Sequence, residues 1–143
     1  MLPTEPKVGW VLRYSYLWHW QHLEGRVEGD KDRPALVLAI VTKLEDGTPA
    51  VRVLPVTHSP PSDPGDAIEI PPATKRRLGL DDERSWIVLT ESNRFVWLGP
   101  DVRPIDTESG YLGPLPPALF EEIKRRFVEL ARGQRHRVTS RSE

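Results

Sequence analysis

The sequence predicts a small, mostly β domain that ends in one amphipathic α-helix. Its 143 residues suffice for one domain, and its 15 prolines and 10 glycines favour short elements with frequent turns. Short runs rich in β-branched and aromatic residues recur between residues 9 and 98. Apolar residues spaced three and four apart, as one face of a helix requires, recur regularly near the end, between residues 119 and 130.

Three runs in the first part of the chain predict strands. Residues 9–18 are rich in aromatic and β-branched types and form the first. Residues 34–42 are almost continuously apolar, which is typical of a short strand buried on both faces. Residues 50–56 return after the turn signal Asp46-Gly47, so we expect residues 35–56 to form a β-hairpin.

The rest of the chain is expected to add shorter elements and then the helix. Further strands are expected at 67–70, 86–90 and 94–98. Loops are expected at 19–32, at the proline-rich 59–66 and at 91–93. One or two helical turns fit residues 73–78. The final helix is expected to have Pro116-Pro117 at its N-terminus, where proline is tolerated, and to stop at Gly133.

Composition limits the kind of protein. The net charge is −1, so the overall charge balance does not indicate a polyanion partner. Without cysteine, disulfides and thiolate metal sites are excluded, which suits a reducing compartment. No apolar leader or membrane-spanning run is present in the sequence, and we expect a cytoplasmic protein.

The chain divides into three parts by composition. Residues 1–7 are expected to be an N-terminal extension, and residues 8–132 the folded domain. Residues 133–143 are expected to be a flexible tail, in which arginines outnumber acidic residues. Such a tail is either a solvated end or an electrostatic contact for nucleic acid or an acidic partner.

Arg33 is the strongest candidate for phosphate chemistry. It stands where a polar loop meets the apolar run that begins at Pro34. A guanidinium at a strand end can present several donors to a phosphate while its aliphatic stem packs on the sheet. The alternative is a surface arginine that pairs with Asp30 or Asp32.

Thr57, His58 and Ser59 follow the strand expected at 50–56. They offer hydroxyl donors and one imidazole that can titrate near neutral pH. Because neighbours along a strand face opposite sides, Thr57 and His58 are expected to point in opposite directions. The alternative is an ordinary strand terminus made of turn-forming residues.

Two tryptophans and two histidines surround the end of the first expected strand. The spacing of Trp18 and Trp20 would place them on one face, which makes full burial of both unfavourable. They are candidates for stacking on nucleic-acid bases or for a partner contact. His19 and His22 lack an obvious third metal ligand, so they are expected to be loop residues, with stacking on RNA bases as the alternative.

Several of these segments occur in the order of a known family. The most specific are Arg33-Pro34-Ala35-Leu36-Val37-Leu38 and the later Pro55-Val56-Thr57. Segments in matching order are 9–12, 67–71, 86–91 and 113–115, followed by the helix. Over about residues 8–131 the chain resembles the PemK/MazF toxins of type II toxin–antitoxin systems.

This resemblance implies a small SH3-like antiparallel β-barrel of the PemK/MazF/CcdB type with a C-terminal α-helix, usually a homodimer. It implies a growth inhibitor held by a cognate antitoxin. Such toxins cleave single-stranded RNA, such as mRNA, without a metal or other cofactor, and leave 2′,3′-cyclic phosphate and 5′-hydroxyl ends. The family's catalytic arginine falls on Arg33 and its catalytic threonine or serine on Thr57. Since His58 is expected to point away from the side of Thr57, it ranks below Thr57. Glu91 falls where the family has an acidic residue, as a structural or pocket position.

Two departures separate the chain from the family pattern. The loop at 19–32 ends in Asp30-Lys31-Asp32, and the proline-rich 59–66 lies next to Thr57, so no RNA sequence preference can be carried over. The alternative function is a non-catalytic barrel that acts as an RNA-binding or regulatory module. A gyrase poison like CcdB is disfavoured, because residues 138–143 are polar and lack an aromatic residue.

Overall fold

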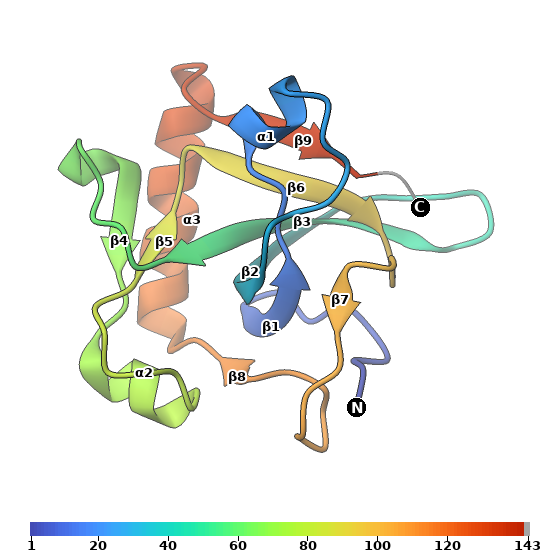
Figure 1. Cartoon of the computed structure of the whole chain (residues 1–143), viewed down its shortest axis with the longest axis horizontal. Coiled ribbons are helices and arrows are strands. Elements are labelled where there is room, and N and C mark those ends of the chain that lie inside the picture. The colour runs from blue at the N-terminus through green and yellow to red at the C-terminus, as the bar shows by residue number, and fades with distance from the viewer. Residues whose placement is uncertain (142–143) are drawn as a thin grey trace.

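The computed structural model describes residues 1–141, and in this range one β-sheet of nine strands is accompanied by three α-helices (Figure 1). The strands are β1 Trp10–Ser15, β2 Asp32–Lys43, β3 Pro49–Thr57, β4 Ala67–Glu69, β5 Trp86–Val88, β6 Glu91–Val96, β7 Val102–Arg103, β8 Gly113–Pro114 and β9 Arg137–Ser140. The helices are α1 His19–Leu23, α2 Pro72–Arg77 and α3 Pro117–Arg132, and a 3-10 turn spans Pro64–Asp66. The expected mostly β class with a helix near the end of the chain is confirmed.

The long hairpin of β2 and β3 lies at the centre of the sheet. The two strands pair antiparallel from Ala35 opposite Pro55 to Lys43 opposite Pro49, as the sequence predicts. β1 pairs with the first half of β2, where Tyr14 lies opposite Arg33. The register of β2 and β3 shifts twice beyond Val37, which marks β-bulges. The outer part of this hairpin extends away from α3 (Figure 1).

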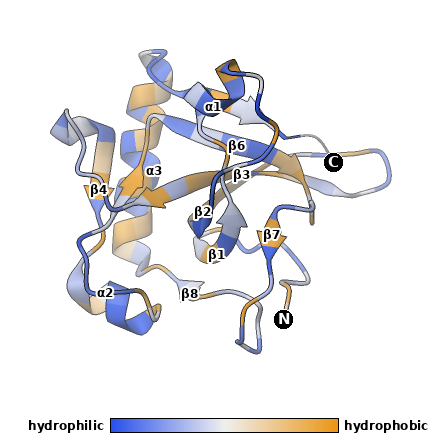
Figure 2. Ribbon diagram, in the orientation of Figure 1, coloured by the Kyte–Doolittle hydropathy of each residue, from blue (hydrophilic) through white to orange (hydrophobic). Residues whose placement is uncertain are grey.

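Both faces of the sheet are buried over residues 35–38, whereas residues 40–43 are exposed, so the strand expected to be buried on both faces at 34–42 is confirmed only in its first half. Leu36, Leu38 and Leu54 face one cluster, to which α3 contributes Ile123 and Leu130. The alternate residues of the same strands belong to a second cluster, which contains Ala35, Val37, Val51, Val53, Leu12, Tyr14, Tyr16 and Phe95. In Figure 2, β5 is apolar and α3 alternates between apolar and polar segments, as expected for a helix with one buried face.

Two sequence predictions in the loops are wrong. The sequence predicts a loop at 91–93, but these residues begin β6. Ser92 and Asn93 are fully buried there, and their side chains form hydrogen bonds with His136 and with the Leu17 backbone. The expected loop at 19–32 contains the helix α1. The buried Gln21 fixes this helix, because its side chain accepts from the Trp18 backbone N–H and donates to Asp30.

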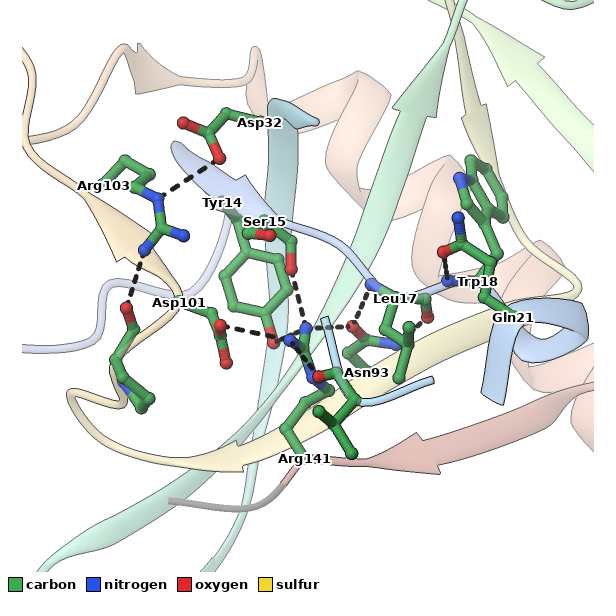
Figure 3. A network of polar contacts seen from close by, with 12 residues as sticks. Tyr14, Ser15, Leu17, Trp18, Gln21, Asp32, Asn93, Asp101, Arg103 and Arg141 are labelled. Carbon is green, nitrogen blue, oxygen red and sulfur yellow. Dashed lines mark hydrogen bonds and ion pairs between the residues drawn. The ribbon is translucent and has the colours of Figure 1, made fainter. Parts of the chain in front are cut away.

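The prediction of a flexible tail from residue 133 is also wrong for the described residues. β9 pairs in parallel with β6, from Arg137 opposite Glu91 to Ser140 opposite Arg94. Arg141 then buries its guanidinium against Tyr14, Ser15, Asn93 and Asp101 (Figure 3). Alternating hydropathy is too weak in this short polar segment to indicate a strand. Residues 142 and 143 lie outside the described range.

The N-terminal extension is packed rather than free. Tyr111 donates its hydroxyl to the Glu5 carbonyl at 2.6 Å and accepts from the Lys7 backbone N–H at 2.9 Å. Gly110 has φ +78°, and a side chain there would lie 2.4 Å from the backbone of Leu2. Among residues 1–141, no helix has the length and apolar character needed to cross a membrane.

Candidate functional site

The open end of the β2–β3 hairpin brings Arg33 and Thr57 together. The regular pairing that begins at Ala35 and Pro55, continued by two residues, places Arg33 opposite Thr57. Both residues line a cleft of about 250 Å³ whose other walls come from residues 79–85 and from Arg13 and Lys31. The two sequence-predicted catalytic residues therefore line the same cleft, although they stand 24 positions apart in the chain.

The side chain of Arg33 is held in place from two sides. Its guanidinium carbon lies 4.9 Å from the centre of the Trp18 ring, and one terminal nitrogen donates to the Val56 carbonyl at 3.2 Å. Its Nε is buried and has no hydrogen-bond partner in the described structure. Burial lowers the pKa of Arg33, although Tyr16 and Asp30 oppose this shift.

The expected surface ion pair of Arg33 is not formed, so that alternative is wrong. Asp30 instead pairs with Arg26 and accepts from Gln21. Asp32 pairs with Arg103 (Figure 3), and the two side chains approach to 3.2 Å. Within residues 1–141, Arg33 forms no ion pair with a carboxylate. A half-buried cation whose charge no carboxylate neutralises favours the binding of an anion in the adjoining cleft.

Thr57 and Ser59 form a small turn at the end of β3. The Thr57 hydroxyl oxygen accepts from the Ser59 backbone N–H at 3.2 Å. The hydroxyl proton of Thr57 remains available, because a hydroxyl can donate once while it accepts. Thr57 can therefore donate to a phosphate oxygen held beside Arg33.

His58 is turned toward the loop at 79–85, and both of its ring nitrogens face groups of that loop. Its Nδ1 lies 3.0 Å from the Arg84 carbonyl, and its Nε2 lies 3.0 Å from an Asp81 carboxylate oxygen. An imidazole whose two nitrogens both face this loop is poorly placed for proton transfer beside Arg33. The ranking of Thr57 above His58 is consistent with this geometry.

A second cleft of about 440 Å³ adjoins the first and contains the two tryptophans. Its lining includes Trp18, Trp20, Lys31, Arg33, Thr57, His58, Ser59 and Val88. Trp18 is half-buried under Arg33, whereas Trp20 lies on α1 with 54% of its surface exposed. A large exposed aromatic ring beside cationic groups is suited to stacking on an unpaired nucleobase.

Glu91 fixes the start of α1 through the backbone of His19. The Glu91 carboxylate accepts from the Tyr16 hydroxyl at 3.1 Å and from the His19 backbone N–H at 2.9 Å. These bonds fix the segment that carries Trp18 and therefore the ring on which Arg33 rests. His19 and His22 stand with ring centroids 6.4 Å apart on this helix.

No protein-family model and no curated protein matches this chain. Six of the expected site residues border the two joined clefts, namely Arg33, Thr57, His58, Trp18, Trp20 and Ser59.

Two parts of the site were missed in the sequence. Lys31 borders both clefts, but it lies between two aspartates in a loop of mixed charge, which concealed its position. The loop at 79–85 forms one wall, and it reaches Thr57 only because β5 pairs with the end of β3. No local sequence signal indicates that contact.

The environment of Glu91 is expected to make the free energy of unfolding depend on pH. Burial raises its pKa above the usual value, against its hydrogen bonds. The folded protein thus binds this proton more tightly than the unfolded chain does. The resulting stabilisation is complete below the unfolded-state pKa and is lost as the pH rises through the folded-state pKa.

Glu91→Gln is expected to remove this contribution. Chemical denaturation of both proteins between about pH 4 and 7 should show a smaller decline of the free energy of unfolding with rising pH in the variant. Asp101, whose pKa burial also raises, contributes equally to both curves. Parallel curves would contradict the role given to Glu91.

Proposed function

We propose that this protein is an endoribonuclease that cleaves single-stranded RNA without a metal ion. One observation carries the proposal: a half-buried Arg33, unpaired with any carboxylate in the described chain, stands beside Thr57 where two clefts meet. Arg13 and Lys31 add positive charge along the same walls, where Asp32 and Asp81 are the acidic groups. Trp18 and Trp20 add the aromatic surface that unpaired bases require.

The proposed reaction uses the RNA's own 2′-hydroxyl as nucleophile. The 2′-oxygen bonds to the adjacent phosphorus while the bond from phosphorus to the next 5′-oxygen breaks. The 2′-hydroxyl loses its proton to solvent in the open cleft, and the departing 5′-oxygen gains one there. The products are a 2′,3′-cyclic phosphate and a 5′-hydroxyl end.

Arg33 and Thr57 would act on the charge that develops at phosphorus. Preorganised donors aimed at such charge supply a large share of the rate enhancement in many enzymes. The guanidinium is preorganised by Trp18 and the Val56 carbonyl, so little rearrangement is needed when the phosphate arrives. The Thr57 hydroxyl would donate to a non-bridging oxygen.

The wider biological role enters the proposal from the family resemblance alone. We propose that the sheet corresponds to the SH3-like barrel of the PemK/MazF toxins and that the protein is a growth-inhibiting toxin. A homodimer, a cognate antitoxin and action on mRNA in the cytoplasm belong to the same proposal.

Incubation of the purified full chain with a mixed RNA in the presence of EDTA tests the cleavage. Discrete fragments with 5′-hydroxyl and 2′,3′-cyclic phosphate ends are expected, identified by end-labelling with and without phosphatase. Intact RNA under these conditions, with binding retained, would favour the alternative of an RNA-binding module. Intact RNA without binding would overturn both.

Trp20→Ala is expected to weaken binding of single-stranded RNA. Stacking of one base on an aromatic ring contributes about 1–3 kcal/mol, so the Kd should rise by roughly 5- to 150-fold. Fluorescence anisotropy of a labelled oligoribonucleotide, with uncleavable 2′-O-methyl riboses, measures the change. Leu23→Ala on the same exposed helix is the matched control and should leave the Kd unchanged. Equal affinities of the wild type and Trp20→Ala would contradict the stacking.

A further inference from the structure

At the rim of the first cleft, one imidazole and two carboxylates converge from distant parts of the chain. His58 follows β3, whereas Asp81 and Glu83 lie in the loop between α2 and β5. The His58 Nε2 stands 3.0 Å from Asp81 and 3.4 Å from Glu83. One ligand atom from each of the three residues lies within 4.8 Å of the others.

The contacts of His58 determine which of its two ring nitrogens carries the proton and which has a free lone pair. Nδ1 lies 3.0 Å from the Arg84 carbonyl, which can only accept, and 3.2 Å from the Ser85 hydroxyl, which donates its own proton to the Glu83 carbonyl, so Nδ1 carries the proton and donates. In the neutral ring, Nε2 is then an acceptor. Three acceptors therefore face one another, an arrangement that a positive charge between them would stabilise. Donation of the second ring nitrogen to a carbonyl is also the usual support of a metal-binding histidine.

Asp81 is oriented by groups outside the cluster. Its other carboxylate oxygen accepts from the Lys75 ammonium at 3.0 Å and from the Glu83 backbone N–H at 3.1 Å. Lys75 is itself buried, with 5% of its surface exposed, so it anchors Asp81 firmly. The oxygen that faces His58 makes no contact with Lys75 and is left for a ligand.

We propose that His58, Asp81 and Glu83 bind a divalent transition-metal ion such as zinc. Ligands about 2.1 Å from one ion stand roughly 3.0–3.4 Å apart in octahedral or tetrahedral geometry, which matches both measured separations. An imidazole nitrogen favours zinc and related ions over magnesium or calcium, which prefer oxygen ligands. All three side chains are exposed, so water can complete the coordination.

A bound ion would link the loop at 79–85 to the end of β3. This link lies beside Thr57 and Arg33 but includes neither residue, and the proposed cleavage needs no metal. The metal site is therefore independent of the proposed function. It can exist in a protein that cleaves no RNA, and cleavage in EDTA can occur in a protein that binds no metal.

Titration of the chelator-free full chain with zinc chloride at pH 7.5, followed by calorimetry, tests the site. One strong site is expected in the wild type, and magnesium chloride should give no comparable heat. His58→Ala and Glu83→Gln should each weaken zinc binding by about tenfold or more. His22→Ala, which removes a histidine on α1 outside the cluster, is the matched control and should bind zinc as the wild type does.

The choice of variants distinguishes a loss of zinc ligands from a loss of folding. Glu83 is largely exposed, with 74% of its side chain accessible, so its replacement by glutamine should leave the fold intact, as circular dichroism can verify. Absence of zinc binding by the wild type would overturn the proposal. So would unchanged binding in both variants, loss of binding in His22→Ala, or equal affinity for magnesium.

Discussion

Arg33→Ala is expected to slow RNA cleavage by at least about 100-fold, the loss usual when one preorganised donor to a developing charge is removed. The structural reason is that Arg33 is the cation best positioned in the cleft: Trp18 supports it, the Val56 carbonyl orients it and no carboxylate neutralises it. Single-turnover cleavage of a defined oligoribonucleotide, measured in EDTA, gives the rate.

Two further variants test whether the rate depends on the placement of the Arg33 guanidinium or only on positive charge in the cleft. Arg33→Lys keeps the positive charge but loses the planar fork that stacks on Trp18, so most of the rate should still be lost. Arg13→Ala removes an exposed cation from the wall of the same cleft and should change the rate only slightly. If Arg13→Ala were as slow as Arg33→Ala, the proposed role of Arg33 would be wrong. The same expectation holds in bacteria, where expression of Arg33→Ala should not arrest growth.

Arg141→Leu is expected to lower the free energy of unfolding by about 3–5 kcal/mol, the range found when one partner of a buried ion pair is removed. The Arg141 side chain is 2% exposed and pairs with Asp101 at 3.1 Å. It also donates to Ser15 and Val27 carbonyls and to the Asn93 side chain (Figure 3). Urea denaturation followed by tryptophan fluorescence measures the loss.

The double variant with Asp101→Leu tests the cause. Burial already raises the pKa of Asp101 although Arg141 opposes the shift, so the carboxyl left behind is costly to keep charged. Removal of both partners should therefore cost less than the sum of the single losses. Arg137→Ala, on the exposed side of β9, is the control and should change stability by less than about 0.5 kcal/mol. Strict additivity would show that Arg141 acts through its carbonyl contacts alone.

The hairpin and the C-terminal helix could be predicted because their signals are local. The turn at Asp46-Gly47 and the apolar runs beside it set both strands, and the spacing of apolar residues in 119–130 set α3. The same patterns placed Arg33 and Thr57 at strand ends. The expectation that these two residues form one site came from the order of the segments that resemble the PemK/MazF toxins, and not from the hairpin pattern alone.

The surroundings of that pair could not be predicted, because they depend on contacts between distant segments. Which carboxylates pair with which arginines follows from packing: Asp32 joins Arg103 and leaves Arg33 without an acidic partner. The wall formed by residues 79–85, with the cluster around His58, exists only because β5 pairs with the end of β3.

The sequence by itself therefore determined the β class, the hairpin, the terminal helix and the two residues at the hairpin's open end, because hydrophobic periodicity and turn chemistry act over a few residues. Only the tertiary structure decided that residues 137–140 join the sheet and that Arg141 is buried. A polar segment next to the end of the chain has no periodicity of its own to indicate a strand. It becomes one because β6 offers unpaired backbone groups and because Asp101 and neighbouring carbonyls offer partners to its arginine.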